Sequence, residues 1–145
     1  VLSLSLAVGA GCAGGGTGDD DDDAATTPGT ACTPLTPTLS VIQTAIFTPQ
    51  CALASCHDSV GPSGNLDLSS ATTSRTEMLD ILSEGTFNSA NIAIVDSGNA
   101  AASFLYMKIT GAVGISGAQM PDTGQTLCAD KIDAIEAWIN AGAQL

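Results

Sequence analysis

Residues 51–57 read Cys-Ala-Leu-Ala-Ser-Cys-His, so a histidine directly follows the second of two closely spaced thiols. Covalent attachment of haem uses two thiols that add to the two vinyl groups, and a histidine after the second thiol whose imidazole reaches the iron. The usual spacing has two residues between the cysteines, whereas this segment has four. His57 is the only histidine in the chain. The segment therefore predicts one c-type haem bonded through Cys51 and Cys56, with His57 as an axial iron ligand.

A disulfide between Cys51 and Cys56, with His57 as an ordinary exposed side chain, is the alternative interpretation of the same segment. An oxidising compartment outside the cytoplasm would favour that bond. The position of the single histidine directly after Cys56 favours the haem interpretation.

A methionine is the natural candidate for a second axial ligand, because no other histidine is present. Met78 and Met107 lie in helical patterns among apolar residues and are expected in the core. Met120 instead precedes Pro121 in a glycine-rich segment, where proline stiffens the backbone. Met120 is therefore the expected distal ligand.

Several segments together resemble a small class I cytochrome c, and more narrowly a group of exported or lipoprotein haem-binding domains. They cover most of residues 39–143 and read IFTPQCALASCH, NLDLS, SFLYMKITG, QMPDTG and IDAIEAWINAGA. The resemblance implies an all-α domain wrapped around one haem c. It implies thioether bonds at Cys51 and Cys56, His57 as proximal ligand and Met120 as distal ligand.

Apolar spacing predicts four helices in the domain, residues 38–145, and no sheet. The first begins near Thr38 and ends at Pro49. The second covers about 74–83 and is stopped by Gly85. The third covers 101–109, and the last and clearest, with Trp138 on its apolar face, covers 129–141.

The N-terminal region is expected to direct export and to tether the domain. Residues 1–12 are apolar and small up to Cys12, which resembles a bacterial lipoprotein signal in which that cysteine is lipidated. An ordinary cleaved export signal is the alternative. Residues 13–37, with glycines and an acidic run at 19–23, predict a disordered, flexible acidic linker. The protein is thus expected in the periplasm or at the cell surface, anchored to a membrane by lipid.

Acidic residues dominate the composition, with 15 Asp and Glu against three Lys and Arg and a formal net charge of −12. Nucleic acid is excluded as an expected partner, because binding it needs clustered cations. From residue 38 onward ten acidic residues still face three basic ones, so a redox partner with a basic docking surface is expected.

Cys32 and Cys128 remain after the other thiols are assigned, and a disulfide between them is expected. Free or differently paired thiols are the alternative.

An electron carrier with one His/Met-ligated haem is the function that these features favour, and the domain could serve as the electron-transfer subunit of an oxidoreductase. Catalysis by the isolated chain is not expected, because no Ser-His-Asp set, phosphate-binding loop or second metal cluster is found. A haem-free surface or interaction lipoprotein, stapled by disulfides Cys51–Cys56 and Cys32–Cys128, is the alternative function.

Overall fold

The described part of the chain, residues 32–145 of a computed structural model, is all-α, with four α-helices and no β-strand within this range. Residues 1–12, including Cys12, and most of the expected linker lie outside it. No helix in the described range is long and apolar enough to cross a membrane. Leu35, within the last part of the expected linker, packs against the core cluster.

The first helical segment delivers the chain to Cys51. The side chain of Thr38 accepts a hydrogen bond from the backbone N–H of Val41 and caps α1, Leu39–Ile42. The helix then widens into a π-helical segment, η1, Gln43–Cys51. The prediction that Pro49 ends the helix is wrong, because η1 contains it. Proline lacks only its own N–H, and the wider winding satisfies the end of η1 with a bond from Ala52 N–H to the Phe47 carbonyl, 2.7 Å long.

The second helix, α2, is Ala71–Met78, capped by Ser70, and the predicted range of 74–83 is therefore displaced. The chain leaves helical geometry at Leu79, and Asp80 has a positive φ of 57°. Residues 79–83 instead exchange backbone hydrogen bonds with residues 92–95, as in the 2.7 Å bond from Ile94 N–H to the Ile81 carbonyl. Gly85 consequently stops no helix.

The last two helices agree more closely with the sequence. A short 3₁₀ turn, Ala100–Ala102, precedes α3, Phe104–Thr110, which ends at Gly111 in the left-handed conformation with φ 69°. The helix α4, Ala129–Asn140, matches the predicted range to within one residue. Between α3 and α4 the chain is irregular, as the glycines predict.

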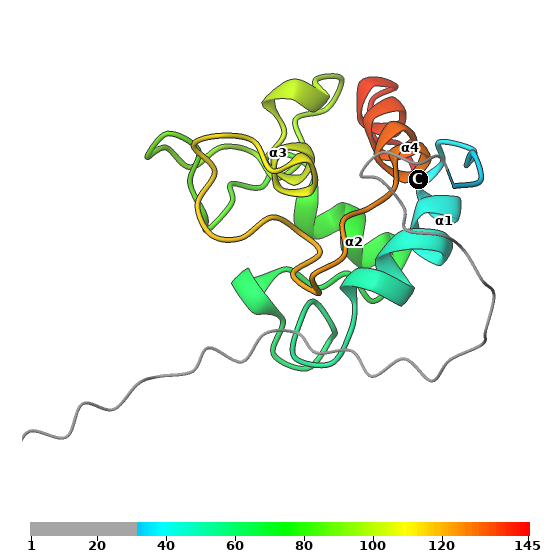
Figure 1. Cartoon of the computed structure of the whole chain (residues 1–145), viewed down its shortest axis with the longest axis horizontal. Helices are drawn as coiled ribbons and strands as arrows, with labels where there is room; N and C mark the ends of the chain where they lie inside the picture. Colours follow the sequence, from blue (N-terminus) through cyan, green and yellow to red (C-terminus); the bar gives the residue numbers. More distant parts are fainter. Residues whose placement is uncertain (1–31) are drawn as a thin grey trace, which may run out of the picture.

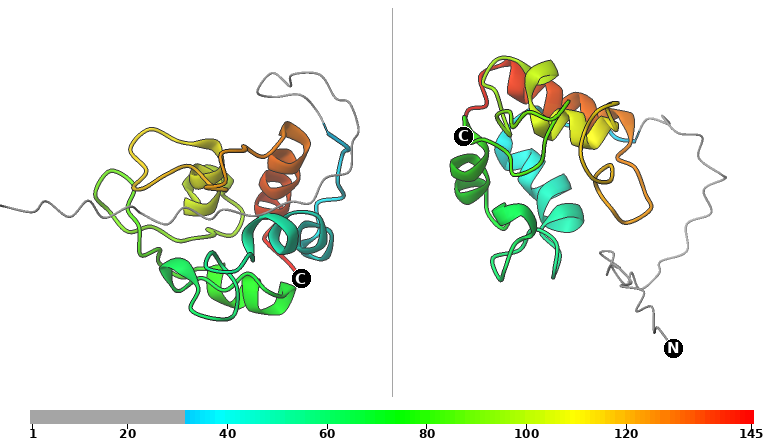
Figure 2. Two further views of the ribbon diagram at one scale, coloured as in Figure 1. Left: turned by 60° about the horizontal axis from the view of Figure 1, so that its bottom comes forward. Right: turned by 90° about the vertical axis from the view of Figure 1, so that its left-hand side faces the viewer.

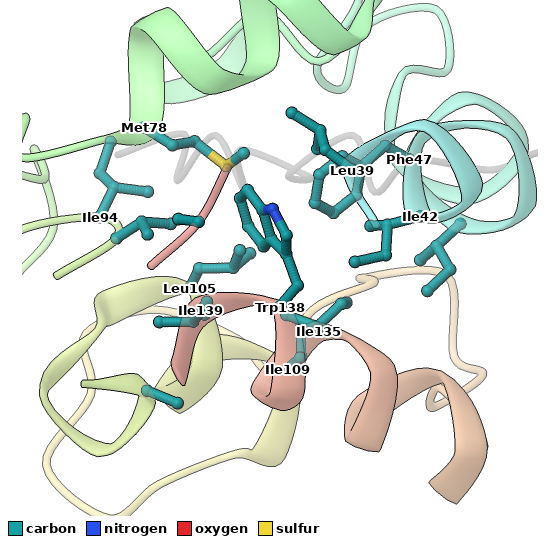
Figure 3. Packing of buried hydrophobic residues seen from close by; sticks show 14 of the residues in the cluster. Leu39, Ile42, Phe47, Met78, Ile94, Leu105, Ile109, Ile135, Trp138 and Ile139 are labelled. Atoms are coloured by element: carbon teal, nitrogen blue, oxygen red, sulfur yellow. The ribbon is translucent and has the colours of Figure 1, made fainter. Parts of the chain in front are cut away.

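The core forms where α1, η1, α3 and α4 meet, with α4 lying beside α1 (Figures 1 and 2). Trp138 of α4 is 2% exposed and lies between Met78 and Leu39 (Figure 3). Its indole N–H donates to the Gln144 carbonyl at 2.8 Å, which satisfies the buried polar atom. Met78 and Met107 are buried, as expected of core residues.

A disulfide joins Cys32 to Cys128, with a Cα–Cα distance of 6.1 Å. This is the pairing that the sequence leads us to expect. It fastens the beginning of the described chain to the residue that precedes α4, across 96 residues of sequence.

Candidate haem-binding cavity

One cavity brings together all four residues that the sequence assigns to haem. Cys51, Cys56, His57 and Met120 line a cavity with a volume of about 350 Å³. Cofactor and small-molecule pockets typically measure about 300–1,000 Å³, so this volume lies at the lower end of that range. Residues 111–127 run as a long irregular segment from α3 to α4 (Figure 1), and Met120 within this segment lines the cavity.

The wall of the cavity is mainly apolar and is supplied by η1, α3, α4 and the loops between them, including the 3₁₀ turn Ser63–Asn65. An apolar wall excludes water from a flat, largely apolar ligand such as a porphyrin. The apolar side chains that contribute are Ile46, Phe47, Leu66, Leu68, Ile94, Phe104, Leu105, Ile109, Leu127 and Ile135.

The turn between the two cysteines is closed by its own backbone. Ser55 has a positive φ of 67°, and the Cys56 N–H donates to the Leu53 carbonyl at 2.9 Å. The His57 N–H then donates to the Cys51 carbonyl at 3.1 Å. A four-residue spacing therefore still folds into a compact turn that places His57 next to Cys51.

The imidazole of His57 is held in one tautomer. Its Nδ1 lies 3.1 Å from the Leu66 carbonyl oxygen, which can only accept, so Nδ1 carries the proton and donates. The lone pair then resides on Nε2. Histidine ligands of metals are commonly fixed in this way, with the other ring nitrogen donating to a backbone carbonyl. Burial lowers the pKa of His57, opposed in part by hydrogen bonds to the backbone of Leu66 and Ser63 and aided by the charge of Lys108, and so favours the neutral ring that a metal needs.

A buried polar network supports the histidine from behind. The Leu68 N–H donates to the His57 carbonyl at 2.8 Å, and the Leu68 carbonyl accepts from Gln43 Nε2 at 2.7 Å. The other end of the Gln43 amide accepts from the Ser74 hydroxyl at 2.9 Å. Sequence reasoning did not find Gln43, because a single glutamine in an apolar helix face gives no signal of a partner 25 residues away.

The two cysteines of the cavity differ in state. Cys51 has a free thiol, so the Cys51–Cys56 disulfide of the alternative interpretation is not formed. Burial raises the pKa of Cys51 to about 12, with Lys131 opposing it, and the thiol is therefore protonated at neutral pH. Cys56 is 6% exposed, and its sulfur is engaged in a disulfide. Thioether formation at Cys56 thus requires that sulfur to be reduced first, since only a thiol adds to a vinyl group.

The backbone around Met120 is hydrogen-bonded to α3. The Met120 N–H donates to the Lys108 carbonyl at 2.9 Å, and the neighbouring Gln119 side chain donates to the Ile109 carbonyl at 2.8 Å. Lys108 itself lines the cavity, and burial lowers the pKa of its ammonium group, with Asp122 opposing. Sequence reasoning found Met120 through the Met-Pro pair but missed Lys108.

The residue types present are those that a haem would use: the free thiol of Cys51, the Cys56 sulfur once reduced, a histidine with Nε2 available and a methionine surround one apolar space. Within residues 32–145, no group of three or more His, Cys, Asp and Glu side chains is placed to hold a metal ion directly. The chain matched no known protein family, no curated protein and no solved structure.

Proposed function

We propose that this chain is an exported electron carrier that binds one haem covalently through Cys51 and Cys56, with His57 and Met120 as axial ligands. The observation that carries the proposal is that these four residues, up to 69 positions apart in the sequence, line one apolar cavity. The fixed tautomer of His57 supports it further.

Each of the proposed site residues has a distinct role. Cys51 and Cys56 bind, His57 and Met120 orient and ligate, and the apolar wall excludes water. Haem bound in this way supplies one-electron exchange at an iron with both axial positions filled. Because the proposal fills both positions with side chains, it assigns electron transfer rather than substrate turnover to the chain. The chain could equally be the electron-transfer subunit of a larger oxidoreductase.

A basic partner surface and a lipid anchor complete the proposal. The chain has a net charge of −12, and two of its three cations are engaged with its own backbone. Arg75 Nε donates to the Ala143 carbonyl at 3.0 Å, and Lys108 Nζ donates to the Ser116 carbonyl at 3.0 Å. The resulting field would attract a positively charged redox partner. Cys12, the proposed lipidation site, lies outside the described residues.

A pyridine haemochrome spectrum of the full chain, made in a host that matures c-type haem, tests the attachment. We expect one haem per chain and its loss in the double variant Cys51→Ala, Cys56→Ala. Absence of haem from the unaltered chain would refute the proposal.

The distal assignment has its own matched pair of variants. Met120→Leu should abolish the absorption band of the methionine–iron bond, because leucine has no sulfur to bind iron. Met107→Leu is the control, because Met107 is buried but does not line the cavity. A persisting band in Met120→Leu would show that Met120 is not the ligand.

The haem-free surface lipoprotein is the second candidate, and the engagement of the Cys56 sulfur in a disulfide favours it. It would need no cofactor, and its cavity would serve another ligand or none. An intact mass equal to the polypeptide with its disulfides, without absorption from haem, would establish this function instead.

A further inference from the structure

We propose that Lys108 is a positioning residue that holds the Met120 loop, residues 111–121, over the cavity and so sets the bond between Met120 and iron. The inference rests on the proposed function for its effect on iron. The contacts that carry it, however, belong to the chain alone.

Lys108 contacts the loop through both its backbone and its side chain. Its carbonyl accepts from the Met120 N–H at 2.9 Å. Its Nζ donates to the carbonyls of Ser116 at 3.0 Å and Ala118 at 2.5 Å. One residue in the middle of α3 therefore binds three points within five residues of the loop.

The rest of the loop has few other constraints close to Met120. Ser116 is fixed on its far side, where its N–H and side chain exchange bonds with the backbone of Thr86 at 2.8 and 2.7 Å. Between Ser116 and Met120 in the described chain, the only other hydrogen bond to α3 is that of the Gln119 side chain. The last four residues before Pro121 thus depend on α3, and mainly on Lys108.

Gly117 leaves room for this contact. It has a φ of 71°, and a Cβ built on it would lie 3.3 Å from Lys108 Nζ. The absence of a side chain lets the ammonium group reach the carbonyls on both sides of the glycine. A lysine suits the position because its ammonium group has three donors on a flexible stem, and bonds from a charged donor are stronger than neutral ones.

The consequence for Met120 follows from geometry. A methionine ligand in a glycine-rich loop is restrained only as well as its backbone, because its side chain has three rotatable bonds. Lys108 fixes the backbone at Met120 itself and at the two carbonyls that lead to it. Loss of the ammonium group should therefore loosen the loop without removing any of the four haem residues.

The test compares Lys108→Met, which keeps the length and apolar stem, with Lys108→Arg, which keeps the charge and donors. Lys131→Met is the matched control, since it removes a cation from α4 that does not line the cavity. The first readout is amide hydrogen exchange at Ser116 and Met120 in the full chain, which does not need haem. The second is the intensity of the methionine–iron band.

In Lys108→Met we expect exchange at these two amides to quicken by about tenfold or more, because two charge-assisted bonds to the loop are lost. The methionine–iron band should weaken. Lys108→Arg should restore both readouts in large part, and Lys131→Met should change neither. Exchange within α4 should remain at the level of the unaltered chain in all three variants.

Unchanged exchange at Ser116 and Met120 in Lys108→Met would overturn the proposal. So would faster exchange that leaves the band intact, because the loop would then not set the ligand bond. Equal acceleration in α4 would also overturn it, since it would show a general loss of stability. If none of the chains carries haem, the proposed function fails, and the exchange data still decide whether Lys108 holds the loop.

Discussion

The two sides of the cavity are built in different ways. On the histidine side, residues 51–57 are contiguous, follow a helix and are supported by the buried Gln43 network. On the methionine side, residues 111–121 form a glycine-rich loop that is held by hydrogen bonds from α3 and from the backbone near Thr86. One side is a contiguous turn backed by a buried polar network, and the other is a glycine-rich loop held by hydrogen bonds to α3 and Thr86.

Because of this difference, the structure should hold the two proposed axial ligands with unequal firmness. Buried, satisfied polar groups are costly to disrupt, whereas surface loops open at small free-energy cost. His57 should therefore keep its place under conditions that release Met120.

The largest effect should come from His57→Ala. Loss of the imidazole should remove the low-spin spectrum and reduce the haem bound per chain, whereas Met120→Leu should keep the haem attached and lose only the sulfur ligand. Haem per chain and the visible spectrum of the two variants measure this contrast. If both variants behave alike, the two sides of the cavity are equivalent and the comparison fails.

The second largest effect should be the loss of stability when the disulfide between Cys32 and Cys128 is removed. In the chain-entropy model, a bond that closes a loop across 96 residues contributes about 4–5 kcal/mol, so the double variant Cys32→Ser, Cys128→Ser should lose about that free energy of unfolding. Urea denaturation of the haem-free chain measures it, with Cys51→Ser as the control because Cys51 has a free thiol. A loss below about 1 kcal/mol would contradict the expectation.

The partly buried thiol of Cys51 gives a chemical measure of the histidine side. With its pKa raised from 9.0 to about 12, the fraction of thiolate at pH 8 falls by about three orders of magnitude. Alkylation of Cys51 in the folded, haem-free chain should therefore be slower by about 1,000-fold than in the denatured chain. The rate should rise with pH through the alkaline range as the thiol ionises. Equal rates in the two states, followed by mass spectrometry, would show that the histidine side is open to solvent.

A smaller loss of stability is expected when the Gln43 network is broken. Gln43→Met keeps the length of the side chain but leaves the Leu68 carbonyl without this donor, at a cost of about 2–3 kcal/mol. Thr44→Ala is the neighbouring control, because its bond to the Ser40 carbonyl is exposed and should contribute less than about 0.5 kcal/mol. Similar losses in the two variants would show that the network does not support the histidine side.

Apolar periodicity and glycine positions predicted the helices whose boundaries depend on nearby residues in the sequence. The helix α4 has a regular apolar face and a glycine after its end, and its range was predicted almost to the residue. The end of α3 was equally clear, because Gly111 adopts the left-handed conformation that terminates it. The displaced boundaries of α2 arose because Ile81 and Leu82 continue a helical spacing, whereas the structure leaves both exposed and pairs this segment with residues 92–95.

Some residues of the candidate site could likewise be predicted from nearby sequence, and others could not. The residues Cys51, Cys56 and His57 follow from their spacing, and Met120 from its neighbouring proline. The Leu66 carbonyl, Gln43 and Lys108 could not be predicted, since each acts through a partner that only the tertiary structure brings near. No pattern of residue types marks a backbone carbonyl as the acceptor for a histidine.

The most direct test of the central claim is the mass of the proteolytic peptide that contains residues 51–57, taken from the full chain made in a host that matures c-type haem. We predict that this peptide carries the mass of one haem and that neither Cys51 nor Cys56 in it can be alkylated after reduction. A peptide without haem, with both thiols alkylated after reduction, would contradict the account.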